Sequence, residues 1–119
     1  MKNWYHGSPS EITELRIGST ITKHYDLACI FSHKPPILSI NADGIIKHNG
    51  REIGLLYLVD EPIHVMDDIE PHPRSTMGDD MEWITKRALK LKLIKEIGQP
   101  KIADVLTEDE INELRKMKT

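Results

Sequence analysis

The chain has 119 residues, of which 39% are hydrophobic and 29% charged, and its formal net charge at pH 7 is -3. This length and composition predict one globular domain over residues 1–119, and the acidic balance argues against a broad nucleic-acid-binding surface, which requires an excess of Lys and Arg. The single cysteine, Cys29, excludes an internal disulfide, and no apolar run has the roughly 18 residues of a membrane-spanning helix, so we expect a cytoplasmic protein without a membrane partner.

Extended segments and turns alternate in the first part of the chain. Residues 4–21 combine a short extended start with several loop signals, and residues 12–15 within them are compatible with a short helical turn. Residues 27–32 are of small, β-branched and aromatic types, which favour a strand. Pro35-Pro36 ends this strand, because proline cannot donate a hydrogen bond to a sheet.

Strands are also predicted in the middle of the chain. The turn signals Asp43-Gly44 and Asn49-Gly50 bracket residues 45–48, which indicates a short strand in a hairpin. Residues 54–60 contain a continuous apolar run, as expected of a central strand that is covered on both faces. Residues 63–66 are a further candidate for a short strand.

The last third of the chain contains a loop and two more strands. Residues 70–80 hold two prolines, a glycine and several charges, which predicts an exposed loop. Residues 81–85 resume as a strand. Leucines alternate with lysines over residues 89–93, and this period of two predicts a half-buried strand.

A helix is expected at the C-terminal end. Thr107 followed by Glu110 resembles a capping box, so the helix is predicted over about residues 107–118. The whole order is rich in strands, and the helices lie near the ends. This order favours the α+β class over a βαβ alternation.

Two clusters of residues are candidates for chemistry. In Tyr5-His6-Gly7-Ser8, the glycine would let a ligand approach the backbone, and the histidine and serine offer polar groups for a ribose hydroxyl; the alternative is a strand end with a satisfied histidine. Glu82 lies inside a predicted strand, where glutamate is disfavoured unless it faces water or serves a purpose. Asp67-Asp68 is either a solvated turn or a pair of carboxylates at a cleft. The six histidines are dispersed without ligand spacing, so we expect no metal.

These clusters carry a resemblance to a known superfamily. Tyr5-His6-Gly7-Ser8 resembles the Y-H-G-[ST] segment that opens the NAD site of ADP-ribosyltransferases, among them diphtheria-type toxins, poly(ADP-ribose) polymerases and rifampin ADP-ribosyltransferases. Cys29-Ile30-Phe31-Ser32 is similar to their I-Y-F-[SA] strand, and Glu82-Trp83-Ile84-Thr85 to the E-Y-I segment with the catalytic glutamate. Tyr57-Leu58-Val59 and then Asp67-Asp68 resemble a strand and acidic pair of the rifampin-modifying enzymes. The resemblance covers roughly residues 4–97.

The resemblance implies a fold and a set of site residues. The fold would be a small ADP-ribosyltransferase-like α+β fold, with two packed, mostly antiparallel sheets and few short helices. NAD would be the substrate, and its binding residues would be Tyr5, His6, Gly7, Ser8, Ile30, Phe31 and Ser32.

The resemblance also implies individual roles. His6 would hydrogen-bond the adenosine ribose, and the Gly7 backbone the nicotinamide amide. Glu82 would bind the nicotinamide ribose and stabilise the positive charge that develops as nicotinamide leaves. Asp67 or Asp68 is the alternative acid, by the pattern of the rifampin-modifying enzymes.

The expected function is therefore NAD-dependent mono-ADP-ribosyl transfer, a glycosyltransferase reaction, to an acceptor that is a protein, a nucleic acid or a small molecule. Ile30 stands where the family has the tyrosine that stacks on nicotinamide. This departure favours one alternative, an inactive module of the same fold that binds NAD, ADP-ribose or a protein. A second alternative is an RNA 2'-phosphotransferase-like enzyme, which shares the fold but uses arginines that are missing before residue 5.

Overall fold

Nine strands, two α-helices and one 3₁₀ turn make up the computed structural model, which describes residues 3–35, 37–40, 43, 45–74 and 80–117. The strands are β1 (Tyr5–Ser8), β2 (Glu14–Leu15), β3 (Thr20–Ile21), β4 (Leu38–Ile40), β5 (Ile46–His48), β6 (Gly54–Val59), β7 (Ile69–Pro71), β8 (Trp83–Thr85) and β9 (Leu89–Gly98). The helices are α1 (Tyr25–Phe31) and α2 (Glu108–Met117), and the 3₁₀ turn is η1 (Ile102–Asp104).

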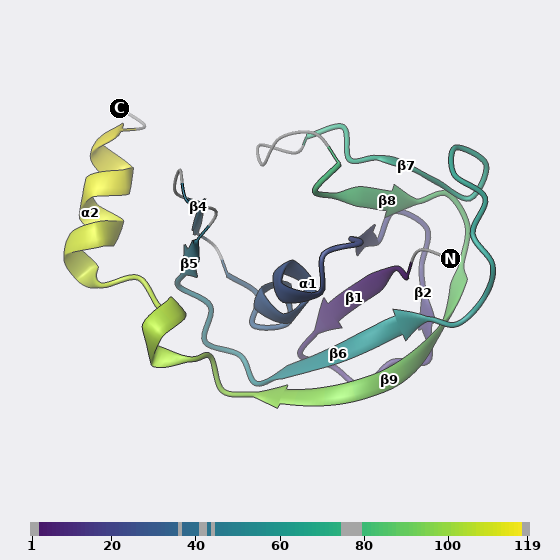
Figure 1. Ribbon diagram of the computed structural model, residues 1–119, viewed down its shortest axis with the longest axis horizontal. Helices are drawn as coiled ribbons and strands as arrows, with labels where there is room; N and C mark the ends of the chain where they lie inside the picture. Colours follow the sequence, from purple (N-terminus) through teal and green to yellow (C-terminus); the bar gives the residue numbers. More distant parts are fainter. Residues whose placement is uncertain (1–2, 36, 41–42, 44, 75–79, 118–119) are drawn as a thin grey trace.

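The strands form two sheets and a separate hairpin (Figure 1). One sheet has the order β1-β6-β9-β2, the other β3-β8-β7, and β4 pairs with β5. All pairs of named strands within the described residues are antiparallel. The α+β class is therefore confirmed, and so is the predicted hairpin strand at residues 45–48, although Gly44 of its turn lies outside the described residues.

Strand β6 is the centre of the larger sheet, as its apolar sequence predicts. It pairs with β1 on one side and with β9 on the other, and its residues are all buried or partly buried. Tyr57 is buried in this strand, and its hydroxyl donates to the carbonyl of Ser10 at 2.9 Å and accepts from the amide of Ile12 at 3.0 Å. One central side chain thereby fixes the loop that connects β1 with β2.

The two sheets share one hydrophobic core. Its buried residues come from both sheets and from the segment before β1: Trp4, Leu15, Ile21, Val59, Ile69 and Leu89. Trp4 meets Trp83 of β8 edge to face, with ring centroids 5.6 Å apart. The sheets are also joined directly, because the amides and carbonyls of Tyr5 and Thr22 exchange hydrogen bonds of 2.8 and 3.0 Å. β1 and β3 therefore lie side by side.

The strand predicted at residues 27–32 is wrong, because most of this segment belongs to helix α1. Leu27, Ala28 and Ile30 are buried, and the helix packs against β1 and β6. The helix is only seven residues long, so its sequence is too short to show a helical period. Packing against the sheet determines the conformation of this segment, and this packing overrides the β-propensity of Ile30 and Phe31.

Four smaller differences concern short segments. The helical turn predicted at residues 12–15 is wrong, since Glu14 and Leu15 pair with β9 as strand β2. Residues 63–66 form no strand, and only an isolated bridge joins Val65 to Ile69. The loop predicted at residues 70–80 begins inside β7, and residues 75–79 lie outside the described part. The strand predicted at residues 81–85 begins only at Trp83, so Glu82 precedes the strand rather than lying inside it. The strand predicted at residues 89–93 is present and extends to Gly98.

The capping box at the start of α2 is confirmed. The amide of Glu110 donates to the hydroxyl of Thr107 and the amide of Thr107 to the carboxylate of Glu110, both at 3.2 Å. Lys47 of β5 pairs with the same carboxylate at 3.2 Å and ties the helix to the hairpin. Among the described residues, no helix is long and apolar enough to span a membrane.

Replacing Thr107 with alanine is expected to loosen the first turn of α2. The substitution removes one of the two reciprocal bonds, and the loss of an N-cap side chain costs about 1 kcal/mol. Amide hydrogen exchange at residues 108–111 is expected to accelerate about fivefold, while β6 keeps its protection. Unchanged exchange in this turn would show that packing on the hairpin holds the helix without its cap.

Candidate functional site

A cleft of about 400 Å³ lies where β1, β3, the C-terminal end of α1 and the start of β8 meet. It is lined by Tyr5, His6, Gly7, Thr20, Phe31, Lys34, Pro35 and Glu82. The cleft combines three residues of the first predicted motif with Phe31 and with the predicted acid. Segments far apart in the sequence therefore contribute to one concave surface of the size usual for a small-molecule site.

Histidine His6 is held in one tautomer. Its Nδ1 lies 2.7 Å from the carbonyl oxygen of Thr20, and because a carbonyl only accepts, Nδ1–H is the donor. Nε2 is then the acceptor of the ring. Burial lowers the pKa of His6, an effect that its hydrogen bond to Thr20 opposes in part. The ring is accordingly neutral at pH 7 and offers a lone pair rather than a charge.

Two charged residues lie on the same cleft. Glu82 directly precedes β8, is half-buried, and accepts a 3.1 Å hydrogen bond from the amide of His72 with its backbone carbonyl. Its carboxylate makes no hydrogen bond or ion pair with any residue the structure describes. Lys34 follows α1 in a left-handed backbone conformation, with φ at 50°. A carboxylate and an ammonium group are thus available to a ligand.

Glycine Gly7 is required by packing as well as by the cleft. A Cβ atom at this position would lie 1.9 Å from the carbonyl oxygen of Ala28 and 2.6 Å from the amide nitrogen of Ser32. β1 can approach the backbone of α1 this closely only because residue 7 has no side chain. The contact sets the position of Phe31 and Lys34 relative to His6.

Three residues of the predicted NAD site lie elsewhere. Ser8 is on β1 but is not part of the cleft lining, and its hydroxyl accepts from the amide of Ser10 at 3.1 Å. Ser32 is fully buried and donates to the carbonyl of Cys29 at 2.5 Å. Ile30 lines a second cleft instead. The helical conformation of this segment explains the difference, because neighbouring helical residues point in directions about 100° apart.

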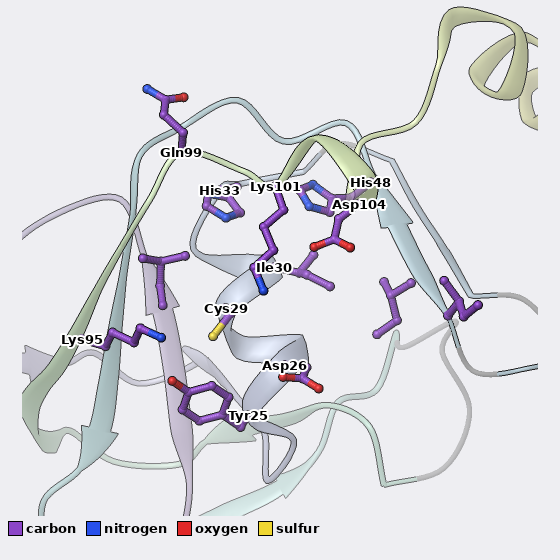
Figure 2. A pocket seen from close by; sticks show the side chains of 13 residues that line it. Tyr25, Asp26, Cys29, Ile30, His33, His48, Lys95, Gln99, Lys101 and Asp104 are labelled. Carbon is purple, nitrogen blue, oxygen red and sulfur yellow. The ribbon is translucent and has the colours of Figure 1, made fainter.

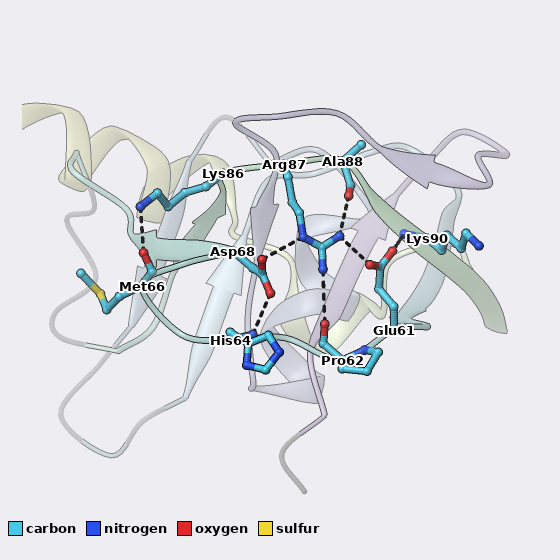
Figure 3. Close-up of polar contacts among 9 residues, drawn as sticks. All are labelled: Glu61, Pro62, His64, Met66, Asp68, Lys86, Arg87, Ala88 and Lys90. Atoms are coloured by element: carbon cyan, nitrogen blue, oxygen red, sulfur yellow. Dashed lines mark hydrogen bonds and ion pairs between the residues drawn. The ribbon is translucent and has the colours of Figure 1, made fainter.

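The alternative acids Asp67 and Asp68 are not part of the cleft lining either. Asp68 is buried and accepts from the guanidinium of Arg87 at 2.8 Å and from the amide of His64 at 2.8 Å, as Figure 3 shows. These two donors hold the pKa of Asp68 below its usual range. Arg87 also pairs with Glu61 at 2.5 Å. Asp68 therefore joins the segment before β7 to the turn between β8 and β9, and Asp67 is exposed beside it.

Three lining residues, Thr20, Lys34 and Pro35, are not among the predicted site residues. Thr20 contributes its backbone carbonyl, which any residue type supplies, and only the pairing of β1 with the end of β3 brings it to His6. Lys34 and Pro35 reach the cleft because α1 ends at Phe31. No group of three or more His, Cys, Asp and Glu side chains within the described ranges is placed to hold a metal ion.

Comparison of the chain with protein-family models, curated proteins and solved structures finds no match. The geometry of the cleft and the chemistry of its residues are therefore the basis for assigning a function.

The pKa of His6 predicts a pH dependence of stability. Its folded pKa is lowered, so between the folded and unfolded values the unfolded chain binds a proton that the folded chain does not. The free energy of unfolding is expected to fall as pH drops below about 6.5, by up to about 1.4 kcal/mol per pH unit. In His6→Asn, an amide N–H can replace the bond to Thr20 without titrating, and part of this slope is expected to disappear. Equal slopes in urea titrations of the wild type and His6→Asn would contradict the assignment.

Proposed function

We propose that this protein is an NAD-dependent mono-ADP-ribosyltransferase with a small ADP-ribosyltransferase-like fold. The observation that carries the proposal is the cleft itself, which unites Tyr5, His6 and Gly7 with Glu82. These are the residues for which the sequence resemblance implies contact with NAD. Their convergence from β1 and from the start of β8 is what a common binding site requires.

The chemistry of the cleft suits the parts of NAD. The free Nε2 of His6 accepts a hydrogen bond from a ribose hydroxyl. Tyr5 and Phe31 provide aromatic surface for the nicotinamide ring, and the Gly7 backbone is available to its amide. The ammonium group of Lys34 provides a positive charge that attracts the pyrophosphate of NAD. The carboxylate of Glu82 accepts from the hydroxyl of the nicotinamide ribose.

The reaction breaks the bond between the ribose C1' and the nicotinamide nitrogen. The electron pair of this bond leaves with nicotinamide and neutralises its ring, so positive charge develops on the ribose. Glu82 stabilises this charge electrostatically, because its carboxylate has no competing partner among the described residues. The acceptor nucleophile then bonds to C1' and loses a proton.

The direct test is nicotinamide release. We expect purified protein incubated with NAD to release nicotinamide, measured by chromatography, and His6→Asn to release it about tenfold more slowly. The asparagine can retain the hydrogen bond to Thr20 but lacks Nε2, so the loss reports substrate contact rather than folding. His24→Asn, at an exposed histidine outside the cleft, is the matched control. Equal release by the wild type and His6→Asn would contradict the role of His6.

A second candidate is an NAD-binding module without turnover. One observation favours it: the segment that resembles the nicotinamide-stacking strand is helical, and Ile30 lines a different cleft. This candidate predicts that NAD raises the melting temperature of the wild type but not of His6→Asn, with no nicotinamide released in either. Release that depends on Glu82 would exclude it.

A further inference from the structure

A second cleft of about 400 Å³ lies between α1, β5, the end of β9 and η1. Figure 2 shows its side chains, with His33 and His48 at one end, Lys95 and Lys101 near Cys29, and Tyr25 at the other end. None of its lining residues is shared with the cleft around His6 and Glu82. It is a separate concave site on the same domain.

The two histidines are built into the fold by backbone contacts. His33 is 4% exposed and His48 is 1% exposed, and their rings stack with centroids 5.6 Å apart and an angle of 7° between the planes. His33 Nδ1–H donates to the carbonyl of Glu52 at 2.7 Å. His48 Nδ1 accepts from the amide of Gly50 at 3.1 Å. The rings therefore have opposite tautomers, and both tautomers are imposed by the loop between β5 and β6, through Gly50 and Glu52.

The opposite tautomers leave a donor and an acceptor for a ligand. Because Nδ1 of His33 carries the proton, its Nε2 is an acceptor, and because Nδ1 of His48 is an acceptor, its Nε2–H is a donor. Neither Nε2 bonds to a described residue. Every side-chain nitrogen or oxygen that is fully enclosed within the described ranges has a hydrogen-bond partner. The two Nε2 atoms have no partner among the described residues, so they are not enclosed, and they are open to the cleft that the rings line.

Charges of opposite sign line other parts of this cleft. The ammonium groups of Lys95 and Lys101 extend toward Cys29, whereas Asp104 lies near His48 and Asp26 near Tyr25 (Figure 2). No ion pair joins these four charges to one another in the part of the chain described. The two lysines suit an anion, and Asp104 near His48 suits a hydroxyl donor.

We propose that this second cleft binds a ribonucleoside 5'-monophosphate. Lys95 and Lys101 hold the phosphate, and the carboxylate of Asp104 accepts hydrogen bonds from the ribose hydroxyls. His33 and His48 bind the base edge, because every nucleobase carries a hydrogen-bond donor next to an acceptor. The volume of about 400 Å³ lies in the range of small-ligand sites. The proposal is independent of the NAD cleft.

Calorimetric titration with AMP, GMP, CMP and UMP tests the proposal. We expect at least one of them to bind, and its affinity to fall about tenfold in Lys101→Gln and in His48→Asn. Asparagine can keep an oxygen for the amide of Gly50 while removing the Nε2–H donor. Lys101 is exposed, so Lys101→Gln does not endanger folding. The matching nucleoside is expected to lose no affinity in Lys101→Gln.

Two control variants distinguish binding in this cleft from binding elsewhere on the protein. Lys92→Gln changes a lysine on β9 outside both clefts and is expected to bind the nucleotide as the wild type does. His6→Asn alters the other cleft and reports any nucleotide that binds there instead. Affinity that falls in His6→Asn but not in His48→Asn would move the nucleotide to the other cleft and overturn the proposal. Inorganic phosphate binding as tightly as the nucleotide, or no binding of any nucleotide, would overturn it as well.

Discussion

Replacing Gly7 with alanine is expected to lower the free energy of unfolding by about 3 kcal/mol, or to prevent folding. Overpacking a core commonly costs about 1–3 kcal/mol, because neighbouring side chains can shift. At Gly7 the new Cβ would lie 1.9 Å from the carbonyl oxygen of Ala28 and 2.6 Å from the amide nitrogen of Ser32. These are backbone atoms of α1 and of the residue after it, so only movement of the helix relieves the clash, and the cost lies at the upper end.

Gly54 provides the matched control for this prediction. A Cβ there would lie 1.8 Å from the side-chain oxygen of Ser32 and 2.6 Å from its Cβ. Ser32→Gly removes both atoms, so it is expected to rescue Gly54→Ala in a double-mutant cycle but not Gly7→Ala. Urea titrations of the single and double variants measure the difference. If Gly7→Ala were within about 1 kcal/mol of the wild type, β1 would not lie against α1 as closely as described.

The strands can be predicted where one segment carries its own pattern. Residues 54–60 contain a continuous apolar run, and residues 89–93 alternate with a period of two, so each pattern by itself indicates a strand. The capping box of Thr107 and Glu110 likewise needs only local sequence. Helix α1 cannot be predicted in this way, because its conformation depends on close packing against β1 at Gly7, which lies in another part of the sequence.

The same distinction applies to the candidate site. Motifs in the sequence single out His6 and Glu82, but only the placement of the strands brings the two residues to one cleft. Thr20 contributes a backbone carbonyl and Lys34 follows an unpredicted helix, so neither is predicted as a site residue. Asp68 belongs to an acidic pair that is compatible with carboxylates at a cleft. In the structure it forms an ion pair with Arg87, which is distant in the sequence, so this pairing is visible only in three dimensions.

Replacing Glu82 with glutamine is expected to reduce nicotinamide release from NAD at least about a hundredfold, which corresponds to about 2.7 kcal/mol of transition-state stabilisation. This prediction rests on the proposed transferase function. Glutamine keeps the shape of the side chain and one acceptor oxygen but removes the negative charge. The charge matters most when the ribose becomes positive, so the effect is expected in kcat, while the affinity for NAD changes by less than about threefold.

Three further variants decide whether the loss is specific to Glu82. Glu96→Gln removes an exposed carboxylate of β9 outside the cleft and is expected to leave release unchanged. Asp67→Asn and Asp68→Asn test the alternative acids. Asp68→Asn is expected to lower the melting temperature, because it weakens the pair with Arg87, and to leave the rate per folded molecule unchanged. Release that survives in Glu82→Gln but is lost in Asp67→Asn or Asp68→Asn would contradict the assignment, and the cleft would then bind NAD without supplying its acid.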